Sequence, residues 1–448
     1  MMMLCEIFWK FSQSGLPQML LLLLFTCGLY FTFRAIEDQE EGKSSLVQPL
    51  IAAGFFGLMV LTHWLTAWIF FGYLIFAAIA FRPRGIVALA SFAVVMLMVA
   101  YPVIRMIQIT GQPFGLARFV FYNGLAGGSE STVMRTLDLS ATPLQIDGLL
   151  VKIFTTTLVQ AANIIPFLGG ILAAPIFFIA LLHPFKRKPI ADFRWLLLLM
   201  WLFAALGMAI FGINTTDTLH PNQIHLLFAP VMAAYGLAFL SILWSRLDVV
   251  SSTPFLRNAH YWVIILLSAA PMLMSLPRDV ILYLRISDLG GWHQMPPYFP
   301  KGLKQVLPPQ VNRDPIQPDI IVSDQPWAVA WYSDVPSLWL PRSMDDLSTF
   351  EKKASDLGTP VAGILVTPSS GNTGTSLEVV QEYGDLAPLA FESLVRRVSG
   401  PVSEQNSFLQ NSPYLEPIRK RYPYRLPLHN LGITYYSSKR PTDPENSN

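Results

Sequence analysis

The sequence predicts an α-helical multi-pass membrane domain, with about 8 spans plus an interfacial helix, followed by a small exoplasmic α/β domain. Charged residues make up 13% of the 448 residues, against roughly 25% in an ordinary globular protein. Hydrophobic residues make up 52%, and the mean hydropathy is +0.44. Acidic residues outnumber basic ones only after about residue 285. The chain therefore has a long apolar part and a polar C-terminal part.

A helix needs about 20 residues to cross the hydrocarbon core of a bilayer, and seven apolar runs are about that long or longer. The runs occupy residues 16–35, 47–81, 85–107, 149–183, 194–212, 224–243 and 261–277. The run 47–81 is too long for one straight helix. We therefore predict that it forms two short passes that meet near Thr62 and His63.

The run 149–183 is not uniformly apolar. Its first part carries polar side chains at spacings of three or four residues, namely Lys152, Thr156, Gln160 and Asn163. Such spacing places them on one face of a helix. We predict that 149–165 lies at the membrane interface or lines a polar cavity, and that 166–183 is a span.

Basic residues in short loops predict the orientation of the helices, because such residues are enriched on the cytoplasmic side. Three loops carry them, at Arg82 and Arg84, at Lys186 to Arg194, and at Arg246 and Arg257. With these loops inside, the segments 108–148 and 213–223 and everything after about residue 285 lie outside. We expect a multi-pass protein of the plasma (inner) membrane whose C-terminal domain is exoplasmic or periplasmic. The same parity places the N-terminus outside, and residues 1–15 do not resemble a signal peptide.

The polar part alternates short β-rich runs with helical ones, which predicts a small α/β domain. Strands are expected at 319–322, 337–340 and 361–366, and helices at 327–332 and 344–357. The predicted parts are a membrane domain (1–285), a membrane-surface linker (286–318), an exoplasmic α/β domain (319–439) and a disordered tail (440–448). The loop 369–376 lacks the lysine of a phosphate-binding loop and is interpreted as a linker. The stretch 413–427 is not assigned.

Four stretches resemble, in the same order, segments of the GT-C glycosyltransferases, in the branch of the protein O-mannosyltransferases and the bacterial aminoarabinose transferase acting on lipid A. GLMVLTHW (57–64) is similar to the pattern G-x-x-x-x-LT-K/H. YPVIRMIQITGQPFG (101–115) is similar to P-W-x-x-R-N-x-x-x-T-G-x-P-x-G, with Val103 and Met106 replacing the tryptophan and asparagine. The segment 220–238 lies where the family often shows R-Y-x-x-P-x-x-P, and 323–341 resembles its exoplasmic α/β module. The resemblance covers most of residues 1–345.

The resemblance implies transfer of a sugar from a polyprenyl-phosphate donor to an acceptor on the outer side of the membrane. It also implies that the catalytic acids lie in the family's first exoplasmic loop. The segment 8–25 matches the region after the third span in such proteins, so three spans and the acidic loop have no counterpart in this sequence. We therefore expect the chain as written to be catalytically incomplete.

A lipid-phosphate donor requires cationic or hydrogen-bond-donating groups near the outer interface. The candidate substrate-binding residues on that side are Arg105, His220, Asn222, Gln223, His225, His63, Arg118 and Arg135. Arg105 falls where the family's motif has its arginine, and the 220–225 group surrounds a helix start that suits an anion. Structural interpretations stay open: Arg105 as an anchor to lipid headgroups, the 220–225 group as a polar turn capped by Asn222, and His63 as a turn residue.

No catalytic residue is assigned. The acidic residues on the predicted outer side are Glu130, Asp138, Asp147 and Asp217, each interpreted as a solvated loop carboxylate because none is paired with another. No His, Asp or Cys cluster has metal-ligand spacing, so no metal site or certain cofactor is assigned and a divalent metal is left open. Trp327, Trp331 and Trp339 are expected either to form the core of the C-terminal domain or to stack on sugar rings.

Two functions remain open. The chain is a membrane glycosyltransferase, a hexosyl- or pentosyltransferase with a lipid-linked sugar donor and a glycan, lipid or protein acceptor, or it is a non-catalytic pseudoenzyme or lipid-binding partner subunit. The sequence has no internal repeat of the kind expected in a secondary transporter. A net charge of +2 gives no reason to expect a nucleic-acid partner, and two cysteines are too few for a disulfide framework.

Overall fold

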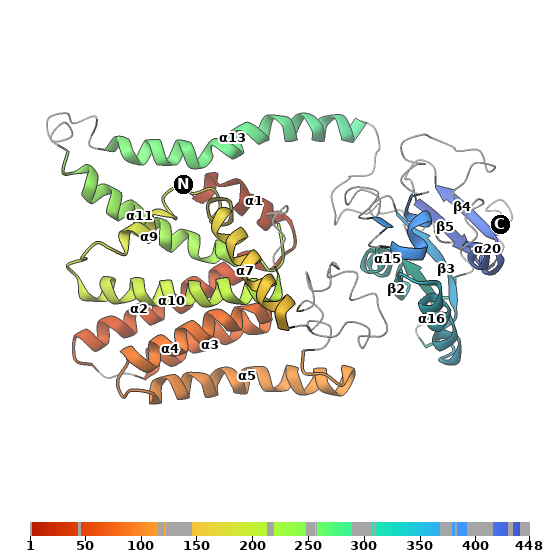
Figure 1. The fold of residues 1–448 in the computed structure, drawn as a ribbon, viewed down its shortest axis with the longest axis horizontal. Coiled ribbons are helices and arrows are strands. Elements are labelled where there is room, and N and C mark those ends of the chain that lie inside the picture. The colour runs from red at the N-terminus through yellow and green to blue at the C-terminus, as the bar shows by residue number, and fades with distance from the viewer. Residues whose placement is uncertain are drawn as a thin grey trace. The chain divides into compact units, whose positions relative to one another are not determined.

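The computed structural model divides into two compact units. The residues it describes are 2–43, 46–114, 121, 146–212, 219–247, 256, 258–288, 307, 311–314, 316–367, 379–380, 383–391, 415–428 and 433–439. Described residues up to Val280 form a unit of helices, the helical unit (Figure 1). Those from Ile281 onward belong to a unit built around a β-sheet, the sheet unit.

The first half of the helical unit follows the predicted pattern closely. Its elements are α1 (Glu6–Gln13), α2 (Gln18–Glu40), α3 (Val47–Thr62), the 3-10 turn η2 (Trp64–Thr66), α4 (Ala67–Ala80) and α5 (Ile86–Thr110). Between α3 and η2, His63 has an extended backbone, with φ −151° and ψ 109°. The prediction that 47–81 forms two short helices meeting near Thr62 and His63 is therefore confirmed.

The second half contains both long and interrupted helices. Its elements are α7 (Ile146–Ala162), α8 (Ile164–Phe167), α9 (Ile176–Ala180), α10 (Lys188–Phe211), the 3-10 turn η5 (His225–Phe228), α11 (Ala229–Trp244) and α13 (Ala259–Asp288). The helices expected in 194–212, 224–243 and 261–277 are all present, as α10, η5 with α11, and α13.

The span predicted at 166–183 is not one continuous helix. This part of the chain forms only the short helices α8 and α9, joined by turns. Gly169 and Gly170 have φ values of +79° and +68°, in the left-handed region that interrupts a right-handed helix. Pro175 follows, and it has no backbone N–H to continue a helix from the preceding turn. The apolar composition of the run concealed these breaks.

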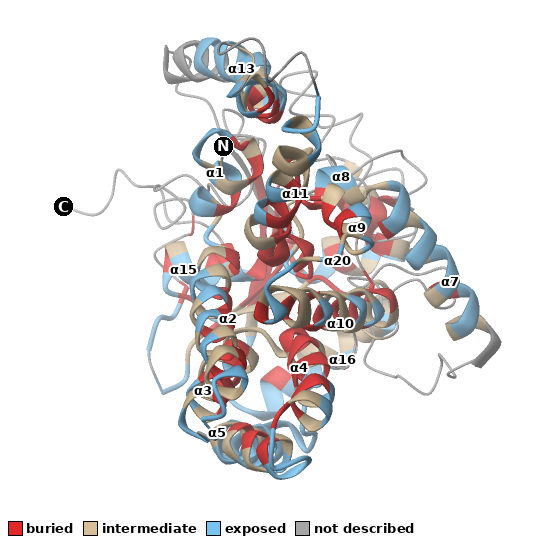
Figure 2. Cartoon of the chain, turned by 90° about the vertical axis from the view of Figure 1, so that its left-hand side faces the viewer, coloured by how far each residue is buried: buried red, intermediate tan, exposed pale blue. Residues whose placement is uncertain are grey.

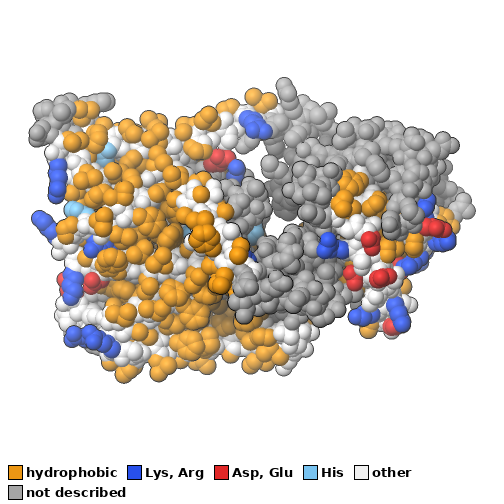
Figure 3. Space-filling model, viewed as in Figure 1, with side chains coloured by type: hydrophobic (Ala, Val, Ile, Leu, Met, Phe, Trp, Pro, Cys, Tyr) orange, Lys and Arg blue, Asp and Glu red, His pale blue; other side chains and the backbone are white. Residues whose placement is uncertain are grey.

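Within the described part of the chain, five helices are long and apolar enough to cross a membrane, namely Gln18–Glu40, Ile86–Thr110, Lys188–Phe211, His225–Trp244 and Ala259–Arg278. Three shorter apolar helices accompany them, at Val47–Thr62, Trp64–Ala80 and Gly148–Ala162. Hydrophobic side chains cover much of the face of the helical unit seen in Figure 3, and Leu23, Leu89 and Leu97 are 61%, 69% and 78% exposed. A surface of this kind is compatible with lipid rather than with water.

Close packing between helices organises the interior of the helical unit. The helix pairs α2 and α3, α3 and α5, and α4 and α10 pack along each other. Gly72 of α4 lies directly against α10, since a Cβ atom there would be 2.6 Å from the Cα atom of Met200. Phe25 of α2 meets Phe228 edge to face, with ring centroids 4.8 Å apart. Residues coloured as buried therefore lie where these helices meet one another (Figure 2).

The two ends of the helical unit differ in charge. Basic residues gather where α2 and α4 end and α5 and α10 begin, at Lys43, Arg82, Arg84, Arg187 and Lys188 (Figure 3). We call this the basic end. The opposite end carries the turn at His63 and the segment 219–224 before η5, and we call it the loop end.

The sheet unit contains a mixed five-stranded sheet in the order β2-β1-β3-β5-β4. Its elements are β1 (Ile320–Ser323), α15 (Pro326–Ser333), β2 (Ser337–Trp339), α16 (Met344–Asp356), β3 (Val361–Val366), α20 (Glu416–Arg421), β4 (Tyr424–Leu428) and β5 (Ile433–Ser437). The first three strands are parallel, and β5 runs antiparallel to β3 and β4. The α/β pattern expected for 319–366 is confirmed, whereas β4 and β5 were not predicted.

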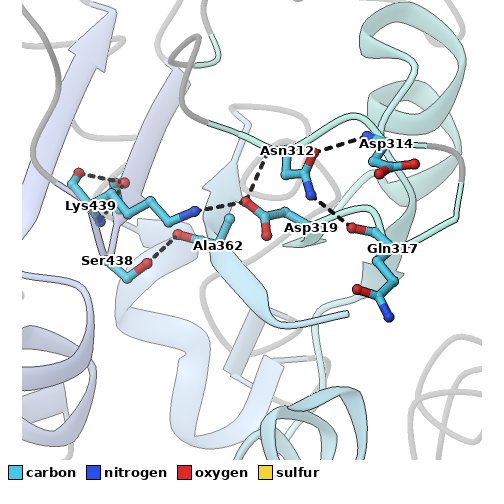
Figure 4. A network of polar contacts seen from close by, with 8 residues as sticks. Asn312, Asp314, Gln317, Asp319, Ala362, Ser438 and Lys439 are labelled. Atoms are coloured by element: carbon cyan, nitrogen blue, oxygen red, sulfur yellow. Dashed lines mark hydrogen bonds and ion pairs between the residues drawn. The ribbon is translucent and has the colours of Figure 1, made fainter. Parts of the chain in front are cut away.

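A polar network holds the amino end of β1 in place (Figure 4). The buried Asp319 carboxylate accepts a hydrogen bond from the Asn312 backbone N–H at 3.0 Å and pairs with the Lys439 ammonium at 3.2 Å. Ser438, beside that lysine, donates from its hydroxyl to the Ala362 carbonyl at 3.0 Å. The network therefore joins the segment before β1, the start of β3 and the end of β5.

Candidate functional site

The loop end brings together residues that are far apart in the sequence. Gln18, at the start of α2, donates from Nε2 to the Pro221 carbonyl at 2.7 Å. Asn222 donates from Nδ2 to the Gly212 carbonyl at 2.9 Å, directly after α10. The Asn222 backbone N–H in turn donates to Nδ1 of His220 at 3.0 Å. These bonds connect the first residue of α2, the end of α10 and the turn before η5.

His225 is fully buried, and both of its ring nitrogens are hydrogen-bonded. Nδ1 accepts from the Trp201 indole N–H at 3.0 Å, and Nε2 lies 2.8 Å from Oε1 of Gln160. An indole N–H can only donate, so the proton of the neutral ring is on Nε2, which donates to Gln160. The ring also stacks on Phe167, with centroids 5.5 Å apart. This geometry gives His225 a structural role and leaves it no free nitrogen for a substrate.

Gln223 is also fully buried and caps the turn η5. Its Nε2 donates to the Phe167 carbonyl at 2.8 Å, and its Oε1 accepts from the Leu226 backbone N–H at 3.2 Å. The first N–H groups of a helix have no partner within the helix, and here the N–H group of Leu226 is already bonded to Gln223. The side-chain amides of Gln223 and Asn222 therefore hold the loop end together through these hydrogen bonds.

His63 differs from these residues, because Nδ1 of its ring has no hydrogen-bond partner among the described residues. The ring stacks on Trp64 with an interplanar angle of 11°. Burial lowers the pKa of His63 to about 4, and the neighbouring His220 lowers it as well. The imidazole is therefore neutral at pH 7 and offers one donor and one acceptor.

A cavity of about 830 Å³ lies next to His63, in the size range of ligand pockets. It is bounded by α3, η2, α4, α5 and the end of α10, and its walls are mainly aliphatic and aromatic. The residues of α5 that line it extend from Phe92 to Met106, a distance of about 21 Å along the helix. The cavity therefore suits a long apolar group lying along α5.

One end of this cavity coincides with the loop end. Thr62 and Trp64, on either side of His63, both line it, whereas His63 itself does not. Phe211 also lines it and immediately precedes Gly212, whose carbonyl accepts the bond from Asn222. The apolar cavity thus ends beside polar side chains of the loop end, which is the arrangement that an amphipathic lipid requires.

The predicted arginines are not all brought to this cavity. Arg105 is exposed on α5, one residue before the lining residue Met106, and is itself outside the cavity wall. Arg118 and Arg135 lie outside the described residues, as do Glu130, Asp138 and Asp217. The helix start containing Asp147 is described, but its side chain is not.

The described residues contain no group of three or more His, Cys, Asp or Glu side chains that could hold a metal ion. Cys5 and Cys27 are both free. In the sheet unit, Trp331 is 81% exposed and Trp327 is 55% exposed, while Trp327 packs edge to face on Trp339. The two helix tryptophans therefore contribute mainly to the surface rather than to the core.

Sequence reasoning did not single out Gln18 or Trp201, although both hold functional candidates in place. A polar residue directly after Pro17, at the start of a long apolar run, was the available signal for Gln18. Gln160 was recognised as part of a polar helix face expected at the interface or in a polar cavity, and the structure buries it. Lys152 of the same face is buried as well and donates to the Phe121 carbonyl at 2.7 Å.

Comparison with models of known protein families, with curated proteins and with solved structures finds no match. The geometry of the loop end and of its cavity is therefore the main guide to function.

Proposed function

We propose that the helical unit binds a polyprenyl-phosphate-linked sugar and serves in transfer of that sugar to an acceptor on the exoplasmic face of the membrane. The observation that carries the proposal is the apolar cavity of about 830 Å³ that ends beside the polar loop end. A polyprenyl chain is a long apolar group joined to a phosphate. The cavity offers an apolar wall along α5 for the chain, and the loop end offers hydrogen-bonding groups near the phosphate.

His63 and Arg105 are the side chains that support recognition of the donor headgroup. His63 sits between two residues of the cavity wall and has one unused nitrogen among the described residues. Arg105 is exposed one residue away from the wall, and its long side chain can reach a phosphate at the membrane surface. The hydrogen bonds of His220 and Asn222 hold the neighbouring backbone in place.

The orientation of the protein belongs to the same proposal. Basic residues favour the cytoplasmic side, so the basic end faces the cytoplasm and the loop end faces outward. In this arrangement the long apolar helices, together with α3 and α4, cross a plasma (inner) membrane, and the sheet unit is exoplasmic. The loop end then lies at the outer leaflet, where the lipid-linked sugar would donate its sugar.

A second candidate function, a non-catalytic subunit that binds the lipid-linked sugar, is favoured by the placement of carboxylates. Among the described side chains of the helical unit, all carboxylates other than Glu6 belong to the basic end, at Glu37, Asp38, Glu40, Glu41 and Asp192. Glu6 pairs with Lys10 at 2.7 Å. The described part of the loop end thus offers a single, ion-paired carboxylate for general acid or base catalysis.

Substitution of Val99 by Trp tests the cavity. Val99 lines it on α5, so the indole should occupy the volume that the lipid chain needs and lower donor affinity by about tenfold or more. The full chain in proteoliposomes is given a polyprenyl-phosphate sugar labelled in the sugar, and bound donor and transferred label are measured separately. Leu97→Trp is the matched control, because Leu97 is on the same helix, 78% exposed and outside the cavity wall.

The two measurements separate the candidates. Binding and transfer that both fall in Val99→Trp but not in Leu97→Trp support a transferase. Binding without transfer in the unmodified chain supports the non-catalytic subunit. Absence of donor binding by the unmodified chain, or equal binding by both variants, would contradict both functions.

A further inference from the structure

A second cavity, of about 840 Å³, lies at the basic end of the helical unit. It is bounded by the ends of α2 and α4, the segment after α4 and the part of α10 from Lys188 to Leu202. It has no lining residue in common with the cavity at the loop end. The cavity at the basic end is therefore separate from the cavity at the loop end.

The deeper part of this basic-end cavity is apolar. Ile79 of α4 and Trp195, Leu199 and Leu202 of α10 contribute to its walls, and Ile79 and Trp195 are 69% and 49% exposed. Along α10 the cavity extends from Lys188 to Leu202, about 21 Å. One leaflet contributes about 15 Å of hydrocarbon, so this length covers a headgroup region and much of one leaflet.

The mouth of the cavity is cationic. Lys43, Arg82, Arg84 and Lys188 line it, together with Glu40 and Asp192. Lys43 is paired with Glu41 at 2.6 Å, outside the lining. Arg82, Arg84 and Lys188 form no ion pair with any carboxylate that the structure describes, so three unpaired cations face two carboxylates. The resulting excess of one positive charge at the mouth complements a headgroup with one negative charge.

The mouth is also held in a defined shape. The Gln39 side chain of α2 donates from Nε2 to the Ala80 carbonyl at the end of α4. Its Oε1 accepts from the Arg82 backbone N–H at 3.0 Å. This amide bridge fixes the backbone that carries the two arginines against α2, so the cavity does not depend on flexible side chains alone.

We propose that the basic-end cavity binds a monoanionic phospholipid of the phosphatidylglycerol type, with its phosphate at Arg82, Arg84 and Lys188 and an acyl chain along α4 and α10. A basic pocket between helices that opens to a charged membrane surface is suited to such headgroups. The tendency of basic residues to face the cytoplasm accounts for the charge of the loops. It does not account for a cavity that continues from those charges along two helices.

The proposal is tested with the full chain in mixed micelles that contain equal amounts of phosphatidylglycerol and phosphatidylcholine, by counting retained lipids with native mass spectrometry. The double variant Arg84→Gln/Lys188→Gln removes two of the unpaired cations. Each cation near a membrane surface contributes about 1 kcal/mol, or about fivefold, to binding an anionic lipid. We therefore expect retained phosphatidylglycerol to fall about 25-fold relative to phosphatidylcholine.

The matched control is Lys186→Gln/Arg246→Gln, which removes two basic residues of the same end that do not line the cavity. Its lipid retention should equal that of the unmodified chain. Equal losses in both double variants would mean that the lipid responds only to overall charge, and no loss in either would mean that the cavity holds no anionic lipid. Either result overturns the proposal.

A pair of apolar variants tests the chain-binding part independently of charge. Ile79→Trp fills the cavity, whereas Ile75→Trp adds the same side chain to an exposed position of α4 outside the cavity wall. Only Ile79→Trp should lose phosphatidylglycerol. Thermal unfolding identifies variants that fail to fold, and retention of the lipid by a folded Ile79→Trp variant would contradict the assigned site.

Discussion

At the scale of single residues, the loop end contains two histidines with opposite environments. His225 is fully buried and has both nitrogens bonded inside the protein. His63 lies in the turn after α3 and retains an unused nitrogen among the described residues. Both histidines are polar residues flanked by apolar sequence. Residue type alone therefore did not distinguish a structural histidine from a ligand-binding one.

Substitution of His225 by Leu should destabilise the helical unit. It leaves the Trp201 N–H and Oε1 of Gln160 without these partners in the interior, and each unpaired buried group costs about 1–3 kcal/mol. The free energy of unfolding is measured by denaturant titration in detergent. The double variant His225→Leu/Gln160→Leu should cost less than the sum of the two single variants, because the polar pair is removed together. Strict additivity would argue against the bonded network.

The titration of His63 predicts an acid-dependent loss of stability. Burial lowers the pKa of His63 to about 4, compared with 6.5 for an ordinary histidine, so the unfolded chain binds the proton first as the pH falls. The contribution of the neutral ring is complete above pH 6.5 and is lost as the pH falls toward 4. Unfolding temperatures at pH 7.5 and 5 should therefore differ more in the unmodified chain than in His63→Gln. Equal differences in the two proteins would contradict the shifted pKa.

At the scale of elements, glycine determines how closely α4 and α10 approach. The Cβ atom of an alanine at Gly72 would lie 2.6 Å from a backbone atom of α10, and a backbone cannot move aside as a flexible side chain can. The cavity at the basic end is formed by the same two helices. Their spacing therefore affects both the stability of the helical unit and the width of that cavity.

Substitution of Gly72 by Ala should lower the free energy of unfolding by about 1–3 kcal/mol, because the added methyl group overfills a closely packed contact. Gly54→Ala is the matched control within α3, where an added Cβ meets nothing within 4 Å. It should be neutral or stabilising by about 0.5–1 kcal/mol, because Ala favours the helix. Thermal unfolding in detergent compares the two, and equal stability of both variants would show that the helices are not in close contact.

At the scale of the whole molecule, the two units have separate hydrophobic cores. The core of the helical unit is made of residues from α1 to α13, and the cores of the sheet unit use residues from Leu307 onward. The sheet unit also contains buried tyrosines on β5 and next to β4. Ionisation of these tyrosines should therefore affect the stability of the sheet unit.

The sheet unit should lose stability in alkaline solution. Burial raises the pKa of Tyr435 to about 12, and burial together with the hydrogen bond to Glu351 raises the pKa of Tyr422. A raised pKa contributes stability that is complete below pH 10, the ordinary value for tyrosine, and is lost as the pH rises toward 12. Pulse proteolysis in urea, followed with an antibody to the C-terminus, measures unfolding of this unit at pH 9 and 11.5. Tyr435→Phe should show a smaller decrease, and an unchanged decrease would refute the role of this tyrosine.

Periodic patterns of the sequence determined the helices and the first three strands of this protein. Apolar runs of span length are recognisable because lipid requires a continuous apolar surface, and the change to alternating short runs after residue 319 marks the sheet unit. The turn at His63 followed from length alone, since one straight helix of 35 residues would exceed the bilayer. The break at 166–183 was missed because an average over a run hides individual glycines and prolines.

Only the tertiary structure decided which polar residues act together. His225, Gln160 and Trp201 are separated by at least 24 residues, so their hydrogen bonds depend on how α7, α10 and η5 pack. The two cavities likewise depend on the spacing between helices, which no local pattern encodes. β5 was not predicted because its pairing with β3 joins residues about 70 positions apart, and β4 lies at the edge of the sheet, paired only with β5. Local periodicity therefore determined the elements of this protein, and packing between distant segments decided its sites.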